Sequence, residues 1–315
     1  MNLLQLIEQY VAFRRGLGEC FQGQAAILRA FGRALGAQAD ISAVRAERVS
    51  AFLAGTGPLT RSWHVRYSAL LGFYRYASSR GYVRTPPLPT TVPKRPPAFV
   101  PYIYSHEELR RLLAATESCQ HPCHRVEPIT MRTVVLLLYG TGLRVREALE
   151  LDRVDVDFNN ALLRVLRTKF FKSRLVPFGP QLSTLLSQYA QRTVSGAFRG
   201  TDHIPFFTSR GGTRLQRNTL DRHFQRLRKQ AGIHRCDGAS YQPRLHDLRH
   251  SFAVHRVLSW YRQGADVQKL LPQLSVYLGH ACLAATQVYL SMTPELLAEA
   301  NNRFERYAAG EGNHG

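Results

Sequence analysis

A chain of 315 residues is long enough for two ordinary domains, and 44% hydrophobic with 10% aromatic residues is typical of a folded protein. Its 42 lysines and arginines outnumber 22 aspartates and glutamates, a formal net charge of +20 that favours a polyanionic partner such as DNA, RNA or an anionic membrane surface. No apolar run reaches the roughly 18 residues of a membrane span, and the N-terminus lacks a signal-peptide pattern. We therefore expect a cytoplasmic protein that does not cross a membrane.

The basic residues are unevenly divided, because only five of the 42 are lysines and 37 are arginines. Arginine grips a phosphate with two parallel hydrogen bonds, although a GC-rich genome would equally raise the arginine share. The five cysteines are scattered and odd in number, which argues against a disulfide framework. Cys119, Cys123 and His124 lie close together, but their spacing does not resemble a zinc knuckle, so we expect neither a metal nor a cofactor.

The first 84 residues show the apolar spacing of helices. Leu3, Leu4, Ile7, Tyr10 and Val11 recur at helical intervals. Further helices are predicted at about 22–35, 43–53 and after residue 60. Four short amphipathic helices can pack as a small bundle, and arginines on the fourth favour a face that follows phosphates.

Residues 85–103 form a predicted linker, because seven of the sixteen prolines lie between Thr85 and Pro101. The second domain, 104–315, then opens with a capping box from Ser105 to Glu108. Two strands are predicted from alternating apolar residues at 161–166 and 173–178. The remaining segments favour helices at about 105–115, 129–139, 145–151, 180–191, 218–231, 246–260, 265–278, 284–291 and 294–307. The expected fold class is mainly α with a small β-sheet.

Several short segments of this second domain combine basic residues with nucleophilic or acid–base groups. Arg144 follows Gly140-Thr-Gly142 at the start of a helix, where free backbone N–H groups favour an anion. His246 and Arg249 are three residues apart and so share one helix face. The loop between the strands contains Lys169 and Lys172, and His280 precedes Tyr289 by nine residues.

This ordered set resembles the active-site signature of the tyrosine recombinases, which include phage integrases, Xer-type resolvases and Cre. The surrounding sequence motifs also match those of the family, namely GTGLRVRE, RLVP, HDLRHSFA, and LGH followed by TQVY. The similarity covers about residues 105–292, and the N-terminal bundle has the size and helicity of the family's core-binding domain. The resemblance implies a site-specific DNA recombinase of the integrase, resolvase or transposase type, from a mobile element or phage. The implied site is Arg144, Lys169, His246, Arg249, His280 and the nucleophile Tyr289.

The chemistry explains these residue types. Tyr289 would attack a phosphodiester and form a 3′-phosphotyrosine, while Arg144 and Arg249 would stabilise the charge on the non-bridging oxygens. His246 can act as general base, and the loop lysine can protonate the departing 5′-oxygen. The resemblance assigns His280 a hydrogen bond to the same phosphate. Because the bond energy is kept in the phosphotyrosine, rejoining would need neither ATP nor metal.

Other residues receive supporting roles. Glu147 is predicted to hold the Arg144 guanidinium in place, and His250, Tyr261 and Tyr277 are interpreted as packing residues. Counting back from the RLVP segment favours Lys169 over Lys172 as the catalytic lysine, with the choice left open. Candidate contacts to double-stranded DNA are Arg61, Arg66, Arg75, Lys94, Arg95, Lys172 and Arg174.

The resemblance further implies a homotetramer on two recombination sites, possibly with accessory proteins. Two alternatives stay open. A type IB topoisomerase would use the same chemistry as a monomer on one duplex, and an inactive relative would keep the fold and bind DNA without cutting it.

Overall fold

A computed structural model describes residues 1–56, 60–96, 100–118, 125–166, 173–192, 203–239, 241–280, 282–291 and 294–308. The chain divides into two compact units, one made of the described residues up to Pro96 and the other beginning at Val100.

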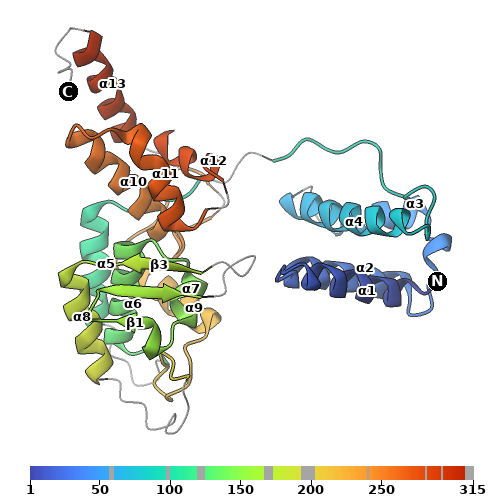
Figure 1. Ribbon diagram of the computed structural model, residues 1–315, viewed down its shortest axis with the longest axis horizontal. Coiled ribbons are helices and arrows are strands. Elements are labelled where there is room, and N and C mark those ends of the chain that lie inside the picture. Colours follow the sequence, from blue (N-terminus) through green and yellow to red (C-terminus); the bar gives the residue numbers. More distant parts are fainter. Residues whose placement is uncertain are drawn as a thin grey trace. The chain divides into compact units, whose positions relative to one another are not determined.

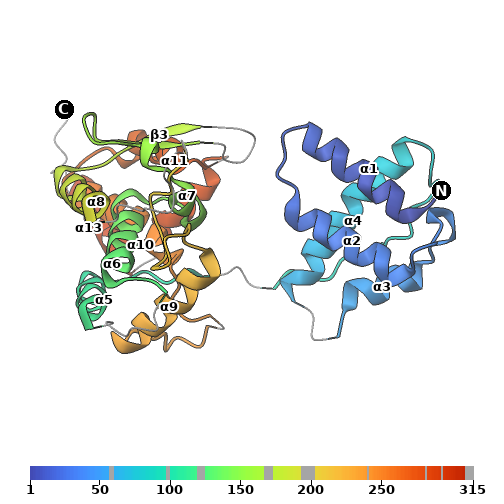
Figure 2. The ribbon, with the colours of Figure 1, turned by 90° about the horizontal axis from the view of Figure 1, so that it is seen from below.

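The first unit is a bundle of helices, drawn in blue to cyan in Figures 1 and 2. Its members are α1 (Leu3–Gly16), α2 (Gln22–Leu35), the 3-10 turn η1 (Ile41–Ala43), α3 (Ala46–Ala54) and α4 (Arg61–Ser79). The third helix begins later than the spacing predicts, because the Asp40 side chain caps η1 by accepting a hydrogen bond from the Ser42 N–H.

Aromatic and aliphatic side chains from α1, α2 and α4 fill the core of this bundle. Tyr10, Phe31, Phe73 and Tyr74 are each at most 2% exposed. Tyr82, Val83 and Leu88 follow α4 and pack against the same core, so the beginning of the proline-rich segment lies on the first unit.

The second unit contains a three-stranded antiparallel sheet in the order β1 (Val156–Asp157), β2 (Leu162–Val165), β3 (Arg174–Pro177). The β2–β3 pair, with Leu163 opposite Val176, confirms the two predicted strands. The strand β1 was not predicted from the sequence, and it is only two residues long. The loop predicted to join β2 and β3 lies largely outside the described residues.

Helices make up most of the second unit, which confirms a mainly α fold with a small sheet. In chain order they are α5 (His106–Ser118), α6 (Pro128–Thr141), α7 (Val145–Glu150), η2 (Arg153–Asp155), α8 (Pro180–Arg192), α9 (Arg217–Gln230), α10 (Asp247–Arg262), α11 (Val267–Leu278), α12 (Ala284–Gln287), η5 (Val288–Ser291) and α13 (Pro294–Ala308). The predicted capping box is present, since the Ser105 N–H donates to Glu108 and the Glu108 N–H donates to Ser105.

The helix α6 is the buried centre of this unit. Val134, Val135, Leu137 and Leu138 are at most 1% exposed, and they lie in the helix that the sequence predicts at about residues 129–139. Figure 1 shows α10, α11, α12 and α13, in orange and red, gathered at one end of the unit. The C-terminal ends of α6 and α11 and the N-terminal end of α10 bear the residues of the candidate site.

Candidate active site

Arg144 is the N-cap of α7 and is held by two different groups. Its Nη1 donates to Glu147 Oε1 at 2.7 Å, and its Nη2 donates to the Gly279 carbonyl oxygen at 2.8 Å. The Arg144 N–H also donates to Glu147. With 38% of the side chain exposed, the guanidinium is fixed in place but still open to a ligand on one side.

Glu147 joins Arg144 to a second arginine. The side chain is 8% exposed, and Arg174 on β3 donates to both carboxylate oxygens, at 3.0 and 2.8 Å. Burial alone would raise the pKa of Glu147, but the hydrogen bonds and charges of Arg174 and Arg144 outweigh it and lower this pKa to about 2. The carboxylate is therefore ionised at neutral pH and orients both guanidinium groups.

Arg249 lies deeper, at 2% exposure on α10. It donates to the Gly142 carbonyl oxygen at 2.6 Å and to the Leu278 carbonyl oxygen at 2.7 Å. Burial, together with the nearby charge of Arg144, lowers the pKa of Arg249 to about 10, so the group stays charged at neutral pH.

Carbonyl groups at two helix ends thus hold the two arginines. Gly142 caps α6 and Gly279 caps α11, and both adopt the left-handed conformation that ends a helix. The carbonyl-bearing end of a helix has negative potential, which offsets the cost of placing two guanidinium groups so close together. A Cβ on Gly142 would lie 2.6 Å from the Phe252 ring, so the close approach requires glycine.

Two histidines project from the first turns of α10. The rings of His246 and His250 have centroids 5.0 Å apart, and the His250 ring lies 5.7 Å from that of Tyr289. Burial, followed by neighbouring positive groups, lowers the pKa of each histidine to about 4. Both imidazoles are therefore neutral at pH 7, and a neutral imidazole can accept a proton.

His280 follows the end of α11. Its Nδ1 is 2.7 Å from the hydroxyl oxygen of Thr286, a residue with no exposed surface. If Thr286 donates this bond, the other ring nitrogen carries the proton and can donate to a ligand. Burial and the charges of Arg249 and Arg144 lower the pKa of His280 to about 4.

Tyr289 lies in the 3-10 turn η5 at 3% exposure, and its ring centroid is 6.1 Å from that of His280. Burial raises the pKa of Tyr289, whereas Arg249 and Arg144 act to lower it. A phenolate would consequently be stabilised by the same two guanidinium groups that could bind a phosphate. The structure thus brings Arg144, Glu147, His246, Arg249, His280 and Tyr289 into one site.

The remaining predicted residues have different positions. Lys169 and Lys172 lie outside the described residues. Arg174 was predicted as a DNA contact, but its guanidinium binds Glu147 inside the site. In the first unit, Arg66 donates to the Phe52 and Leu53 carbonyl oxygens at the end of α3. The other candidate DNA contacts of this unit are exposed, namely Arg61, Arg75, Lys94 and Arg95.

Three residues of the site were missed by the sequence analysis or given another role. Arg174 binds Glu147, and Thr286 is hydrogen-bonded to His280. His250 contacts Tyr289 in addition to packing on α10. The spacing of His246 and His250, four residues apart on one helix, was a usable signal for the last of these. Nothing in the spacing pairs Arg174 with Glu147, because they lie on different elements 27 residues apart.

Comparison with known proteins gives consistent matches. The model of the phage integrase family matches residues 103–295. A protein of Sinorhizobium fredii named as an integrase/recombinase, y4rE, is 38% identical over 314 residues, which cover 94% of each chain. The tyrosine recombinase XerA of Pyrococcus furiosus is 30% identical over 259 residues, or 81% of this chain and 78% of XerA.

Among solved structures, a lambda integrase tetramer bound to a Holliday junction superposes with a TM-score of 0.64. It is 19% identical, and the match covers 92% of this chain and 77% of the integrase. At that identity the likeness establishes the fold, and it agrees with the mainly α architecture described above.

Proposed function

This chain belongs to the phage integrase family and is a site-specific DNA recombinase, and we propose that Tyr289 cuts and rejoins DNA through a covalent 3′-phosphotyrosine. One observation carries the assignment of roles. A buried tyrosine shares its surroundings with two arginines, both of which act on its pKa. Structural ion pairs are common, but a nucleophile close to two fixed cations is suited to attack an anion.

Arg144 and Arg249 would bind the two non-bridging oxygens of the scissile phosphate. Negative charge on these oxygens grows as the phenolate attacks, and donors that are already fixed need no reorganisation at that moment. Arg144 is fixed by its hydrogen bonds to the Glu147 carboxylate and the Gly279 carbonyl oxygen. Arg249 is fixed by its hydrogen bonds to the carbonyl oxygens of Gly142 and Leu278.

The phenol must lose its proton as the bond to phosphorus forms. His246 is neutral at pH 7 and would accept that proton as general base. The ring of His250 contacts both the His246 ring and the Tyr289 ring. His280, oriented by Thr286, would donate a hydrogen bond to a phosphate oxygen.

Departure of the 5′-oxygen requires a second proton. Lys169 or Lys172 would supply it from the loop between β2 and β3, with Lys169 the preferred residue. The phosphotyrosine keeps the energy of the cleaved bond, and a 5′-hydroxyl of a partner strand can reverse the step. Rejoining would accordingly proceed without ATP or metal.

The charge of the chain and its relatives support a proposal for the wider assembly. A net charge of +20 supports binding of double-stranded DNA, with contacts from Arg61, Arg66, Arg75, Lys94 and Arg95 in the first unit. The lambda integrase structure is a tetramer on a Holliday junction, which supports a homotetramer on two sites here. A mobile element is the proposed source and the cytoplasm the proposed location. Within the described residues, no helix is long and apolar enough to span a membrane.

The test is a suicide substrate, a nicked DNA duplex that traps the covalent intermediate. Wild type should form a protein–DNA adduct that survives denaturation, while Tyr289→Phe should form none and still bind DNA. Tyr277→Phe is the matched control, because Tyr277 is a neighbouring tyrosine that packs against the same core cluster. An adduct with Tyr289→Phe would refute the assignment. Relaxation of supercoils by a monomer, without exchange between two sites, would favour a type IB topoisomerase instead.

A further inference from the structure

Three consecutive carbonyl groups lie at the C-terminal end of α11, and each accepts a hydrogen bond from a different arginine. The carbonyl oxygens of residues 277, 278 and 279 accept from Arg174 Nε at 3.0 Å, Arg249 Nη2 at 2.7 Å and Arg144 Nη2 at 2.8 Å, respectively. Carbonyl groups at this end of a helix lack intrahelical partners and carry negative potential, which favours guanidinium groups there. The end of α11 therefore holds all three arginines, including one from β3, a strand that lies beside α11 (Figure 2).

Arg174 differs from the other two because each of its three nitrogen atoms donates to the protein. Its Nη1 and Nη2 donate to the two carboxylate oxygens of Glu147, at 3.0 and 2.8 Å, while Nε is bound to α11. The side chain is 13% exposed, against 38% for Arg144. A Cβ on Gly279 would lie 2.9 Å from Arg174 Nη1, so the guanidinium packs directly against that glycine. Arg174 is thus placed to hold other groups rather than to bind a phosphate itself.

Arg174 and Arg144 bind the same two oxygen atoms. Glu147 Oε1 accepts from Arg144 Nη1 at 2.7 Å as well as from Arg174, and Glu147 Oε2 also accepts from the Arg144 N–H at 2.9 Å. Two of these four hydrogen bonds come from Arg174. The terminal torsion of a glutamate is broad, so without Arg174 the carboxylate can turn, and the Arg144 guanidinium loses a fixed partner.

We propose that Arg174 is a positioning residue for strand cleavage, which acts through Glu147 and the end of α11 to direct the Arg144 guanidinium towards the scissile phosphate. The inference rests on the proposed function, because that function assigns Arg144 to the phosphate. A donor that is already fixed stabilises the developing charge without reorganisation, so loss of Arg174 should slow the chemical step. A direct DNA contact, the role expected from the sequence, would instead weaken binding and reduce its salt dependence.

The first experiment separates the rate of cleavage from DNA affinity. Arg174→Gln should slow single-turnover adduct formation on saturating suicide substrate by on the order of 100-fold, the effect of a small misplacement of a reacting group. Its affinity for the same duplex, measured by fluorescence anisotropy, should match that of Arg164→Gln, which should keep the wild-type rate. Arg164 is an exposed arginine of β2, in the same sheet, and it donates to the Val154 carbonyl oxygen rather than to a residue of the site. A loss of affinity without a loss of rate would make Arg174 a DNA contact and overturn the proposal.

A change in substrate charge identifies the arginine through which Arg174 acts. A scissile methylphosphonate lacks one charged non-bridging oxygen, and its two isomers lack different ones. Each isomer has less charge to stabilise, so the defect of Arg144→Ala should shrink on one isomer and that of Arg249→Ala on the other. The defect of Arg174→Gln should shrink by at least about fivefold on the isomer that relieves Arg144→Ala. An equal defect on the phosphate and on both isomers would indicate a general structural loss and refute the inference.

Arg174→Lys provides a second variant in case Arg174→Gln does not fold. Lysine keeps the charge beside Glu147 but lacks the planar fork with which arginine donates to both carboxylate oxygens. It should unfold at a temperature near that of wild type, and its rate should lie between those of wild type and Arg174→Gln. A wild-type rate with lysine would contradict the positioning role, which depends on direction as well as on charge.

The last experiment observes Arg144 in DNA-free protein by NMR of isotope-labelled arginine. Hydrogen bonds at both Nη atoms block rotation of this guanidinium and should give separate Nη signals, which Arg144→Ala assigns by their loss. Arg174→Gln should merge these signals because rotation is restored, whereas Arg164→Gln should leave them separate. Unchanged Arg144 signals in Arg174→Gln would refute the inference whatever the rates. If wild type forms no adduct but the signals merge, the recombinase chemistry fails while the placing of Arg144 by Arg174 stands.

Discussion

Glu147→Gln is the substitution that most directly tests how the arginines of the site are held. The carboxylate accepts hydrogen bonds from Arg174 and Arg144 while only 8% exposed. Glutamine keeps the shape but removes the charge, which leaves two closely spaced guanidinium groups without their counter-ion. Breaking a buried ion pair in this way costs about 3–5 kcal/mol.

The lowered pKa gives an independent magnitude. A glutamate pKa that falls from 4.5 to about 2 on folding corresponds to about 3 kcal/mol, since one pKa unit is worth about 1.4 kcal/mol. Partial exposure of Arg144 reduces its share, so Arg174 should provide most of this stabilisation. The ion-pair cost and the pKa shift both predict that Glu147→Gln lowers the free energy of unfolding by about 3 kcal/mol at pH 7.

The sign with respect to pH is fixed by the direction of the shift. A carboxyl with a lowered folded-state pKa contributes stability above pH 4.5, and this contribution disappears as the pH falls towards 2. Urea unfolding of wild type and Glu147→Gln should therefore differ by about 3 kcal/mol at pH 7 and by clearly less at pH 3. A difference below 1 kcal/mol at pH 7, or one that does not shrink in acid, would refute the reasoning.

Three further predictions concern the same site. The single-turnover rate of adduct formation should show no inflection between pH 6 and 8, because the pKa of His246 is about 4; an inflection near 6.5 would contradict its role as a neutral base. Thr286→Val should slow adduct formation about tenfold with DNA affinity unchanged, because valine lacks the hydroxyl that is hydrogen-bonded to His280. Thr286→Ser keeps the hydroxyl and should retain the wild-type rate. Gly142→Ala should lower the free energy of unfolding by at least 2 kcal/mol, because φ is +62° and the added Cβ meets Phe252 and Leu278, whereas Gly23→Ala in open space on α2 should not.

Much of the fold could be predicted from the sequence because its signals are local. Apolar spacing located α2 and α6, and the Ser105–Glu108 capping box fixed the start of α5. The motif words likewise placed the arginine, histidine and tyrosine residues that the structure brings together. Their order along the chain carried that information, although no spacing alone would have shown that Gly142 and Leu278 carbonyls hold Arg249.

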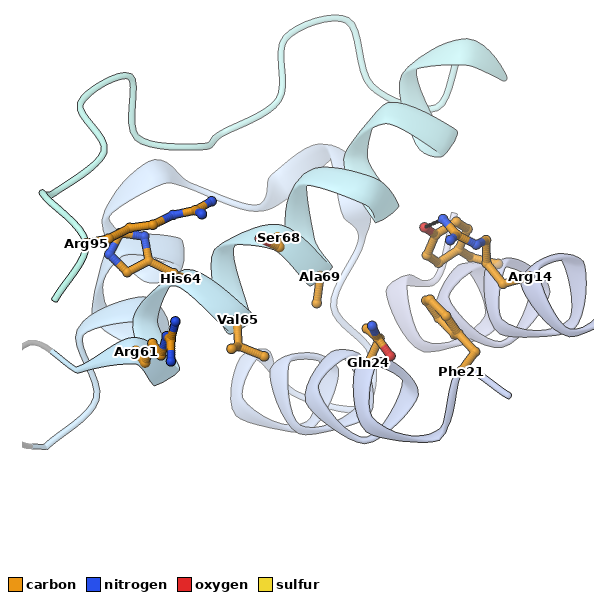
Figure 3. A pocket seen from close by; sticks show the side chains of 10 residues that line it. Arg14, Phe21, Gln24, Arg61, His64, Val65, Ser68, Ala69 and Arg95 are labelled. Atoms are coloured by element: carbon orange, nitrogen blue, oxygen red, sulfur yellow. Dashed lines mark hydrogen bonds between the residues drawn. The ribbon is translucent and has the colours of Figure 1, made fainter. Parts of the chain in front are cut away.

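What could not be predicted depends on contacts between distant elements. The pairing of Arg174 with Glu147 joins β3 to α7, and a basic residue after a lysine-bearing loop was equally consistent with a DNA contact. In the first unit, residues of α1, α2, α4 and the segment after α4 line one cavity, so no single stretch of sequence reveals it (Figure 3). The strand β1 has only two residues, too few for an alternating pattern to be recognised.

The most direct test of the central claim identifies the amino acid that becomes linked to DNA. Adduct from the suicide substrate would be digested with protease and nuclease, and the nucleotide-bearing peptide sequenced by mass spectrometry. We predict that the modification lies on Tyr289, joined to a 3′-phosphate. A modification on Tyr277, Tyr261 or any other side chain, or an adduct linked to a 5′-phosphate, would contradict the mechanism.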